Sequence, residues 1–286
     1  MDNLIFENEL IESQLRLETE ERLREQWETL GISNDFIFCK VMQEKELLEE
    51  LIRRILPDLR FTDLKVEAQK TIEIGPDIHG VRFDVFGTLE DGSTVDIEMQ
   101  VLNTGNLPKR MRYYGSMADV QMLEKGTVYD ELMESYVIMI CPFDLFGEGR
   151  HVYTFKNLCK EDPELELGDG TCKLVLNAAG TMNDVSAKLK AFLDYMAGKA
   201  VDDEYVKKLD EAVKMARINK KWRTEFMIIN MRDREHEYIG REMHKREQIA
   251  EMLKDGKTPE EISAFCKYPM ELIKEVQKNM IAETVK

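Results

Sequence analysis

The sequence predicts an α/β protein in which a short mixed sheet is flanked by helices, with helical additions on both sides of that core. Three patterns predict this class. Apolar residues recur at helical spacing before residue 57, alternate with polar residues between 64 and 102, and return to helical spacing beyond 183. Of the 286 residues, 43% are hydrophobic, which is enough for a well-filled core.

Three helices are expected ahead of the sheet. Residues 8–30 form a charged amphipathic helix that ends at Gly31. A side chain within 33–35 (Ser, Asn or Asp) can cap the second helix, because all three types accept hydrogen bonds from free backbone amides. The third helix covers 44–55 and stops ahead of Pro57, since proline cannot continue a helix.

The alternation over residues 64–102 predicts strands joined by hairpins. Gly75, Pro76 and Gly80 interrupt it, and so does the turn at Asp91-Gly92. The later elements, in chain order, are a helix at 109–125 ended by Gly126, strands at 135–141 and 151–155 with a third candidate at 172–176, and helices at 184–197, 202–249 and 247–280.

Residues 247–286 resemble a small helix-turn-helix unit. Gly256 ends one helix, and Thr258 with Glu261 forms a capping box that begins the next. The third helix, over 270–280, carries two lysines against two glutamates, which is little positive charge for a helix that contacts DNA. We therefore expect a helical cap or a dimerisation piece rather than a base-reading module.

Composition excludes several classes of protein. Five scattered cysteines without a Cys-x-x-Cys pair argue against disulfide and zinc frameworks, and the four histidines lack zinc-hydrolase spacing. No apolar run is long enough for a membrane span and the first residues lack a secretory pattern, so a soluble cytoplasmic protein is expected. The net charge of −16 is unusual for a nucleic-acid enzyme, although residues 1–33 alone contribute nine acidic and three basic residues.

The hairpin over residues 81–100 carries the candidate chemistry. Asp96, Glu98 and Gln100 share one face of the second strand, because side chains alternate along a strand. A two-residue loop would pair Asp84 with Met99 and put the carboxylates of Asp84 and Glu98 on opposite faces. A three-residue loop over 90–92 pairs Asp84 with Glu98. We predict the second loop, since it needs a left-handed residue where the sequence has glycine.

Two facing carboxylates repel each other unless a cation or a proton lies between them. Mg²⁺ suits such a pair, since it is held by one or two carboxylates, water and phosphate oxygens. The ion would activate a water and neutralise charge on a scissile phosphate, and Gln100 could orient that water or contact the phosphate. The same alternation also occurs on strands with one solvated face, so the pattern alone leaves that alternative open.

Five segments, in this order and spacing, resemble the recombination-promoting nuclease/putative transposase family of the PD-(D/E)xK nuclease superfamily. They are Asn34-Asp35-Phe-Ile-Phe-Cys-Lys, Arg82-Phe-Asp-Val, Asp96-Ile-Glu-Met-Gln100, Lys109-Arg-Met-Arg-Tyr-Tyr114 and Gln121-Met-Leu-Glu-Lys-Gly126-Thr-Val-Tyr129. The resemblance covers about 30–180. It implies a restriction-endonuclease-like core that cleaves DNA with Mg²⁺ or Mn²⁺, with Asp84 and Glu98 as metal ligands and Gln100 as a catalytic residue.

Gln100 stands where the wider superfamily usually has lysine. Lysine supplies a positive charge beside the reacting oxygens, whereas glutamine supplies only dipoles and hydrogen bonds, so slow turnover is expected. Asp77, in a literal Pro-Asp pair, is a rival for the first ligand. We prefer Asp84 because it lies within an apolar strand, while residues 75–77 have the composition of a turn.

The helix after the hairpin supplies further candidates for DNA binding or for support of the site. Arg110, Tyr114 and Gln121 fall on one helical face. Arg110 could pair with a phosphate and Gln121 could face the metal, although each also suits a helix surface. Glu46, Glu49 or Glu50 could supply another acidic residue, but a solvated face explains them better.

The expected function is a metal-dependent DNA endonuclease connected with DNA recombination or mobile elements, and dimerisation would let two sites cut two strands. One alternative is a catalytically inactive DNA-binding or regulatory protein that keeps the fold. Another is an interaction protein whose acidic N-terminus meets a basic partner. The expected segments are an acidic helix (1–30), the nuclease-like core (31–180), a helical extension (181–246) and the helical tail (247–286).

Overall fold

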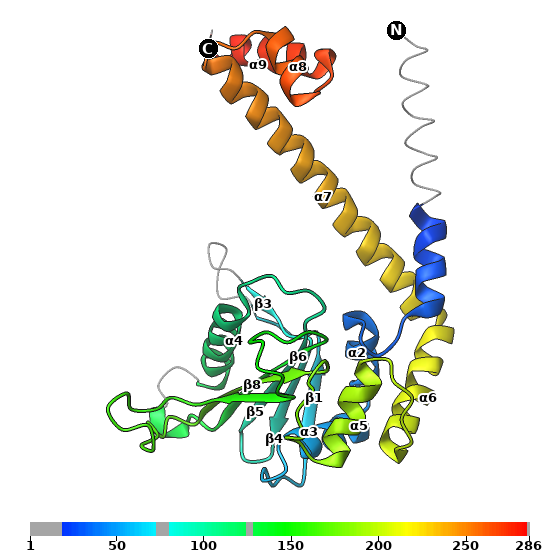
Figure 1. Ribbon diagram of the computed structural model, residues 1–286, viewed down its shortest axis with the longest axis vertical. Helices are drawn as coiled ribbons and strands as arrows, with labels where there is room; N and C mark the ends of the chain where they lie inside the picture. The colour runs from blue at the N-terminus through cyan, green and yellow to red at the C-terminus, as the bar shows by residue number, and fades with distance from the viewer. Residues whose placement is uncertain (1–18, 73–79, 124–127, 285–286) are drawn as a thin grey trace. The chain divides into compact units, whose positions relative to one another are not determined.

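The computed structural model describes residues 19–72, 80–123 and 128–284 (Figure 1). The chain divides into two compact units: Glu25–Arg223, and Thr224–Lys286 together with Met1–Arg24. The four-segment division expected from the sequence stays a prediction.

The unit Glu25–Arg223 contains a six-stranded sheet in the order β1-β4-β5-β6-β8-β7, and its strands β5, β6 and β8 run parallel. The other neighbouring pairs are antiparallel, so the sheet is mixed, as predicted. The strands are β1 (Leu64–Ala68), β4 (Val85–Leu89), β5 (Thr94–Met99), β6 (Ser135–Cys141), β7 (Val152–Phe155) and β8 (Thr171–Asn177), and a separate pair is formed by β2 (Thr71–Ile72) and β3 (Val81–Arg82).

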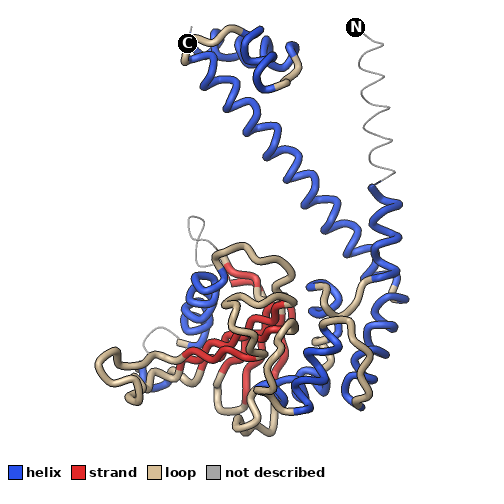
Figure 2. Tube along the Cα trace, viewed as in Figure 1, coloured by secondary structure: helices blue, strands red, loops and turns tan. Residues whose placement is uncertain are grey.

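Helices lie on both sides of this sheet (Figure 2). They are α2 (Asp35–Val41), α3 (Lys45–Ile55), α4 (Leu107–Met122), α5 (Ala187–Met196) and α6 (Glu204–Ile218). The apolar face of α4 packs on β6 and β8, where Leu107 and Met111 contact Val137, Met139 and Val175. The predicted α/β core flanked by helices is therefore confirmed, and α4 closes the face of the sheet on which Asp96 and Glu98 lie.

The caps explain where several helices begin. Asn34 is the residue of 33–35 that caps α2, since its side-chain oxygen accepts from the Ile37 amide at 3.2 Å. The single helix expected over 202–249 is wrong, because it is interrupted at Asn219. That residue has extended backbone, and its side chain accepts from the amides of Lys221 and Trp222. It thus caps the start of α7 (Lys220–Lys254), as asparagine does at helix N-termini.

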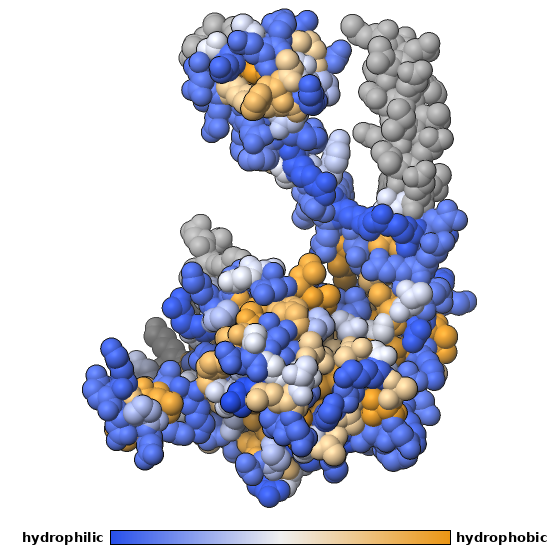
Figure 3. All heavy atoms as spheres, in the orientation of Figure 1, coloured by the Kyte–Doolittle hydropathy of each residue, from blue (hydrophilic) through white to orange (hydrophobic). Residues whose placement is uncertain are grey.

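The second unit contains most of α7 together with α8 (Pro259–Cys266) and α9 (Met270–Thr284). Much of the surface of α7 is hydrophilic (Figure 3). The predicted capping box is present, with reciprocal bonds between Thr258 and Glu261. A small core of Ile249, Ile262 and Ile273 holds the three helices together. None of the helices in the described ranges combines the length and the apolar composition of a membrane span.

The β4–β5 hairpin has the predicted three-residue loop. Its register runs from Val85 opposite Ile97 to Thr88 opposite Thr94, and the Leu89 amide donates to the Ser93 carbonyl. Residues 90–92 therefore form the loop, and Gly92 has a φ of 91°. A side chain at that φ is strained, because its Cβ approaches the following carbonyl oxygen. The earlier interruption at Gly75 and Pro76, and the rival ligand Asp77, lie outside the described residues.

We predict that Gly92→Ala lowers the free energy of unfolding by about 1–2 kcal/mol, because of the left-handed φ. The new Cβ would also lie 3.2 Å from Cγ of Met133. Gly31→Ala is the control, since nothing lies within 4 Å of its added Cβ and its φ is not left-handed. Urea unfolding of both variants tests this, and equal stabilities would contradict the role assigned to Gly92.

Candidate active site

Asp84 and Glu98 lie opposite each other on adjacent strands. Asp84 directly precedes β4, and one further step in the register from Val85 and Ile97 pairs it with Glu98. The Asp84 amide donates to Oε1 of Glu98 at 2.8 Å, and the Met99 amide donates to Oδ2 of Asp84 at 3.0 Å. Each carboxylate is thus held by a backbone amide of the other strand, and the two strands together fix the pair.

Both carboxylates are costly to ionise in this position. Glu98 is 3% exposed, and burial raises its pKa because the charged form loses hydration; the negative charge of Asp84 raises it further. Burial likewise raises the pKa of Asp84, and Asp35 adds to this effect. Arg110 opposes both shifts. The site therefore favours a positive partner between the two carboxyl groups.

Gln100 and Arg110 form a connected pair beside the carboxylates. The Gln100 amide nitrogen donates to the Leu102 carbonyl at 2.5 Å, and Nη1 of Arg110 donates to Oε1 of Gln100. Nη2 of Arg110 donates to the Tyr114 hydroxyl at 3.2 Å and lies 3.7 Å from Oε2 of Glu98. The first half of α4 therefore brings one guanidinium group within reach of both Gln100 and Glu98.

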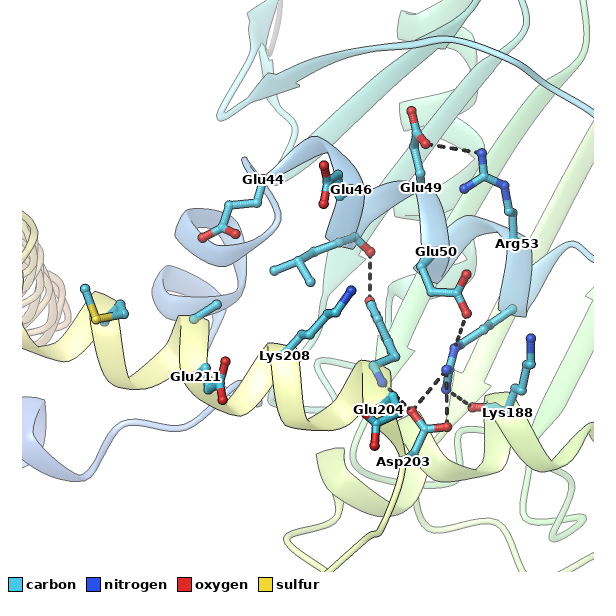
Figure 4. Close-up of a pocket in the computed structure, with 15 residues that line it drawn as sticks. Glu44, Glu46, Glu49, Glu50, Arg53, Lys188, Asp203, Glu204, Lys208 and Glu211 are labelled. Carbon is cyan, nitrogen blue, oxygen red and sulfur yellow. Dashed lines mark hydrogen bonds and ion pairs between the residues drawn. The ribbon is translucent and has the colours of Figure 1, made fainter.

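The other predicted candidates lie apart from this pair. Gln121 is exposed near the end of α4, about 16 Å along the helix axis from Arg110 at 1.5 Å per residue. No hydrogen bond between it and the carboxylates is found in the described ranges. Glu49 and Glu50 are paired within α3, with Arg53 at 3.2 Å and Arg54 at 2.9 Å, and with Glu46 they line a different cavity (Figure 4).

Asp96 is a feature of the site to which the sequence reasoning gave no role. It is 1% exposed, and neither of its carboxylate oxygens has a hydrogen-bond partner within the described part of the chain. Burial raises its pKa well above the usual range, and Glu98 raises it further. The alternation of β5 placed it on the face of Glu98, but its burial under α4 was not visible from that alternation.

Cys39 of α2 is a second neighbour that sequence reasoning did not single out. Burial raises the pKa of its thiol, and the charges of Asp84 and Asp35 raise it further, so the thiol stays neutral. The only signal for it was its place in the segment Asn34–Lys40, one of the segments that carry the family resemblance. Helix α2 thus contributes to the surroundings of Asp84.

The donor set fits a magnesium-like ion that takes the rest of its shell from water and substrate. Within the described ranges, no cluster of three or more histidine, cysteine, aspartate or glutamate side chains is arranged to hold a metal. Asp84 and Glu98 supply two buried carboxyl groups whose unaccompanied charges are disfavoured by the loss of hydration. Mg²⁺ is commonly bound in this way, whereas a site made only of protein ligands would need more.

The mixed sheet between helices is that of a restriction-endonuclease-like α/β core, and the two facing carboxylates lie on adjacent strands of it. Residues 32–169 match the family model described as PD-(D/E)XK nuclease family transposase. The core over these residues is thus similar to that family, which confirms the resemblance found in the sequence. Neither a curated protein nor a solved structure matches the chain.

We predict that Glu98→Gln keeps or raises the melting temperature in EDTA, because it removes a group that burial makes costly to ionise and retains an acceptor for the Asp84 amide. Glu90→Gln is the matched control and should lower it. The Glu90 carboxylate accepts from the amides of Thr62 and Asp63, and these bonds hold its pKa at about 2. A large loss of stability in Glu98→Gln, with none in Glu90→Gln, would contradict the electrostatic description.

Proposed function

We propose that this protein is a divalent-metal-dependent DNA endonuclease in which Asp84 and Glu98 hold Mg²⁺ or Mn²⁺. The observation that carries the proposal is the reciprocal arrangement of these two carboxylates, each fixed by a backbone amide of the opposite strand. The match of residues 32–169 to a nuclease family supports a phosphodiester substrate. Fixed carboxylates suit this chemistry because they need little reorganisation when the ion and the phosphate arrive.

The bound ion would activate a water and neutralise charge on the scissile phosphate. The residues around it have separate tasks in this proposal. Asp84 and Glu98 bind and position the ion. Gln100, whose amide is oriented by Arg110 and the Leu102 carbonyl, uses the free lone pair of Oε1 to orient the water.

Arg110 supplies the positive charge that Gln100 lacks. In the wider superfamily a lysine usually occupies the position of Gln100, but here the guanidinium group arrives from α4 and contacts both Gln100 and Glu98. Arginine stays charged at any working pH and donates several hydrogen bonds, so it can bind a phosphate oxygen while keeping its bond to Gln100. The Tyr114 hydroxyl accepts a further hydrogen bond from this guanidinium group.

We also propose a role in DNA recombination or in mobile elements, following the transposase description of the family. The proposal includes a homodimer, since two sites are needed to cut both strands in one encounter. It also includes a cytoplasmic location. The alternative is a DNA-binding protein that has the nuclease fold but does not cleave. The absence of a lysine at position 100 favours this second function.

Nicking of supercoiled plasmid tests the proposal. We expect cleavage by the wild-type protein with Mg²⁺ or Mn²⁺, none with EDTA, and none from Asp84→Ala or Glu98→Ala. Asp63→Ala is the control, because Asp63 is an exposed aspartate paired with Lys45. Metal-dependent DNA binding without cleavage would favour the inactive alternative, and equal cleavage by every variant would identify a contaminant.

A second prediction concerns Arg110. We expect Arg110→Gln to reduce cleavage by roughly 10²–10³-fold, the usual effect of removing one group that stabilises charge in the transition state. Mn²⁺ binding should be unchanged or tighter, because a cation next to Glu98 is removed, and Arg110→Lys should restore part of the activity. Calorimetric titration with Mn²⁺ beside the cleavage assay separates the two effects. Parallel loss of metal binding and cleavage would contradict this role.

A further inference from the structure

A groove of about 440 Å³ lies between α4 and the β7–β8 edge of the sheet. Its side chains come from α4, from both strands and from the loop after β6. They include Met111, Arg112, Phe146, Phe155, Lys156 and Lys173. The described lining residues include three cations and no carboxylate. In a chain with a net charge of −16, this groove is locally suited to an anion.

A larger cavity, of about 880 Å³, has the opposite character. It lies between α3 and α6, and seven carboxylates and four cations line it (Figure 4). Arg54 is engaged there by Glu50 at 2.9 Å and Asp203 at 3.0 Å. The excess of negative charge would repel phosphates, so this cavity is a poor candidate for nucleic acid despite its size.

The start of α4 adds to the positive character of the groove. Three of its first six residues are basic, and its first turn has no acidic residue. Basic residues there oppose the helix dipole, so the pattern does not serve helix stability but does strengthen an anion site. Arg110 contacts Gln100, while the next two residues, Met111 and Arg112, line the groove. Consecutive residues of one helix thus serve the catalytic site and the groove.

Two phenylalanine rings give the groove a surface for stacking. Phe146 is 38% exposed and Phe155 is 44% exposed, and their ring centroids are 5.2 Å apart. The ring of Tyr153 packs against the ring of Phe146, with 4.7 Å between their centroids. Exposed rings beside cations are the combination that binds single-stranded nucleic acid, because unpaired bases stack on the rings while cations follow the backbone. Bases inside a duplex are already stacked on each other.

The three cations differ in how freely they can meet a phosphate. Lys156 is paired with Glu166 at 2.9 Å, but both side chains are about half exposed and such a pair is weak. Burial raises the pKa of Asp119 on α4, and the positive charge of Lys173 offsets only part of that rise. Arg112 is exposed and has no ion pair within the described part of the chain. Arg112 and Lys173 form no ion pair within the described ranges, so these two groove cations are the ones best placed to meet a phosphate.

We propose that this groove binds an unpaired segment of the DNA substrate, with phosphates on Arg112 and Lys173 and a base stacked on Phe146 or Phe155. The inference rests on the proposed function, which supplies DNA as the substrate. The substrate class is then DNA with an unpaired strand, such as a flap, a branch or a displaced strand. Continuous duplex lacks the free base that the rings require.

Fluorescence anisotropy of the full-length protein in EDTA measures binding separately from cleavage. The probes are a labelled single-stranded oligonucleotide and the duplex of the same sequence. Phe155→Ala should weaken binding of the single strand by about 5- to 100-fold and change duplex binding little, since stacking is lost only for unpaired bases. Arg112→Gln and Lys173→Gln should weaken both probes and lower the salt dependence by about one unit each.

Lys65→Gln is the matched control, because Lys65 is 74% exposed on β1 at the opposite edge of the sheet. It should bind both probes as the wild type does. Melting temperatures show whether Phe155→Ala is folded, and Phe146→Ala provides a second test of stacking. If the phenylalanine and cation variants all bind the single strand like the wild type, or if Phe155→Ala weakens duplex equally, the inference is overturned.

The same variants separate this inference from the proposed function. If cleavage depends on Asp84 and Glu98 but the groove variants bind and cleave like the wild type, the groove assignment alone fails. If single strands bind through Phe155 and Arg112 but no metal supports cleavage, the nuclease proposal fails and the groove remains a DNA-binding site. Loss of single-strand binding in the groove variants, with cleavage of branched DNA reduced in parallel, supports both.

Discussion

The reciprocal pairing of Asp84 with Glu98 is the interaction on which the rest of the site depends. It requires that β4 and β5 meet in one register, because a slip of one residue would turn one carboxylate to the opposite face of the sheet. The three-residue loop ending in Gly92 sets that register, and the two amide–carboxylate bonds hold it at the other end of the hairpin. The relative position of the two carboxylates is thus set by hydrogen bonds from backbone amides.

This arrangement concentrates carboxyl groups in the interior. Asp96, Glu98 and Asp84 all lie where burial raises their pKa values, and the Arg110 guanidinium is the compensating charge that the described residues place beside them. Without a cation, such a cluster lowers the free energy of unfolding, which is a common property of functional sites. Helix α4 covers this cluster: its apolar face packs on the core of the sheet, and its basic residue Arg112 lines the groove.

The hairpin could be predicted from sequence because its determinants are local. Strand alternation placed Glu98 and Gln100 on one face, and the need for a left-handed residue selected the loop ending in Gly92. The family resemblance then supplied the expectation of a divalent metal and of DNA as the substrate. The bond from Arg110 to Gln100 was not predicted, since it joins a helix to a strand and depends on how α4 packs. The break at Asn219 was missed because capping by asparagine leaves no glycine or proline in the sequence. The basic groove combines side chains from α4, β7 and β8 that only the folded sheet brings together.

The central claim is that Asp84 and Glu98 hold one divalent cation between them. A crystal structure of the protein grown with Mn²⁺, with anomalous data collected for manganese, measures this directly. The account predicts one anomalous peak in contact with a carboxylate oxygen of each residue, and its loss in Glu98→Gln. A well-ordered site with no peak between the two carboxylates, or a peak bound to other residues, would contradict it.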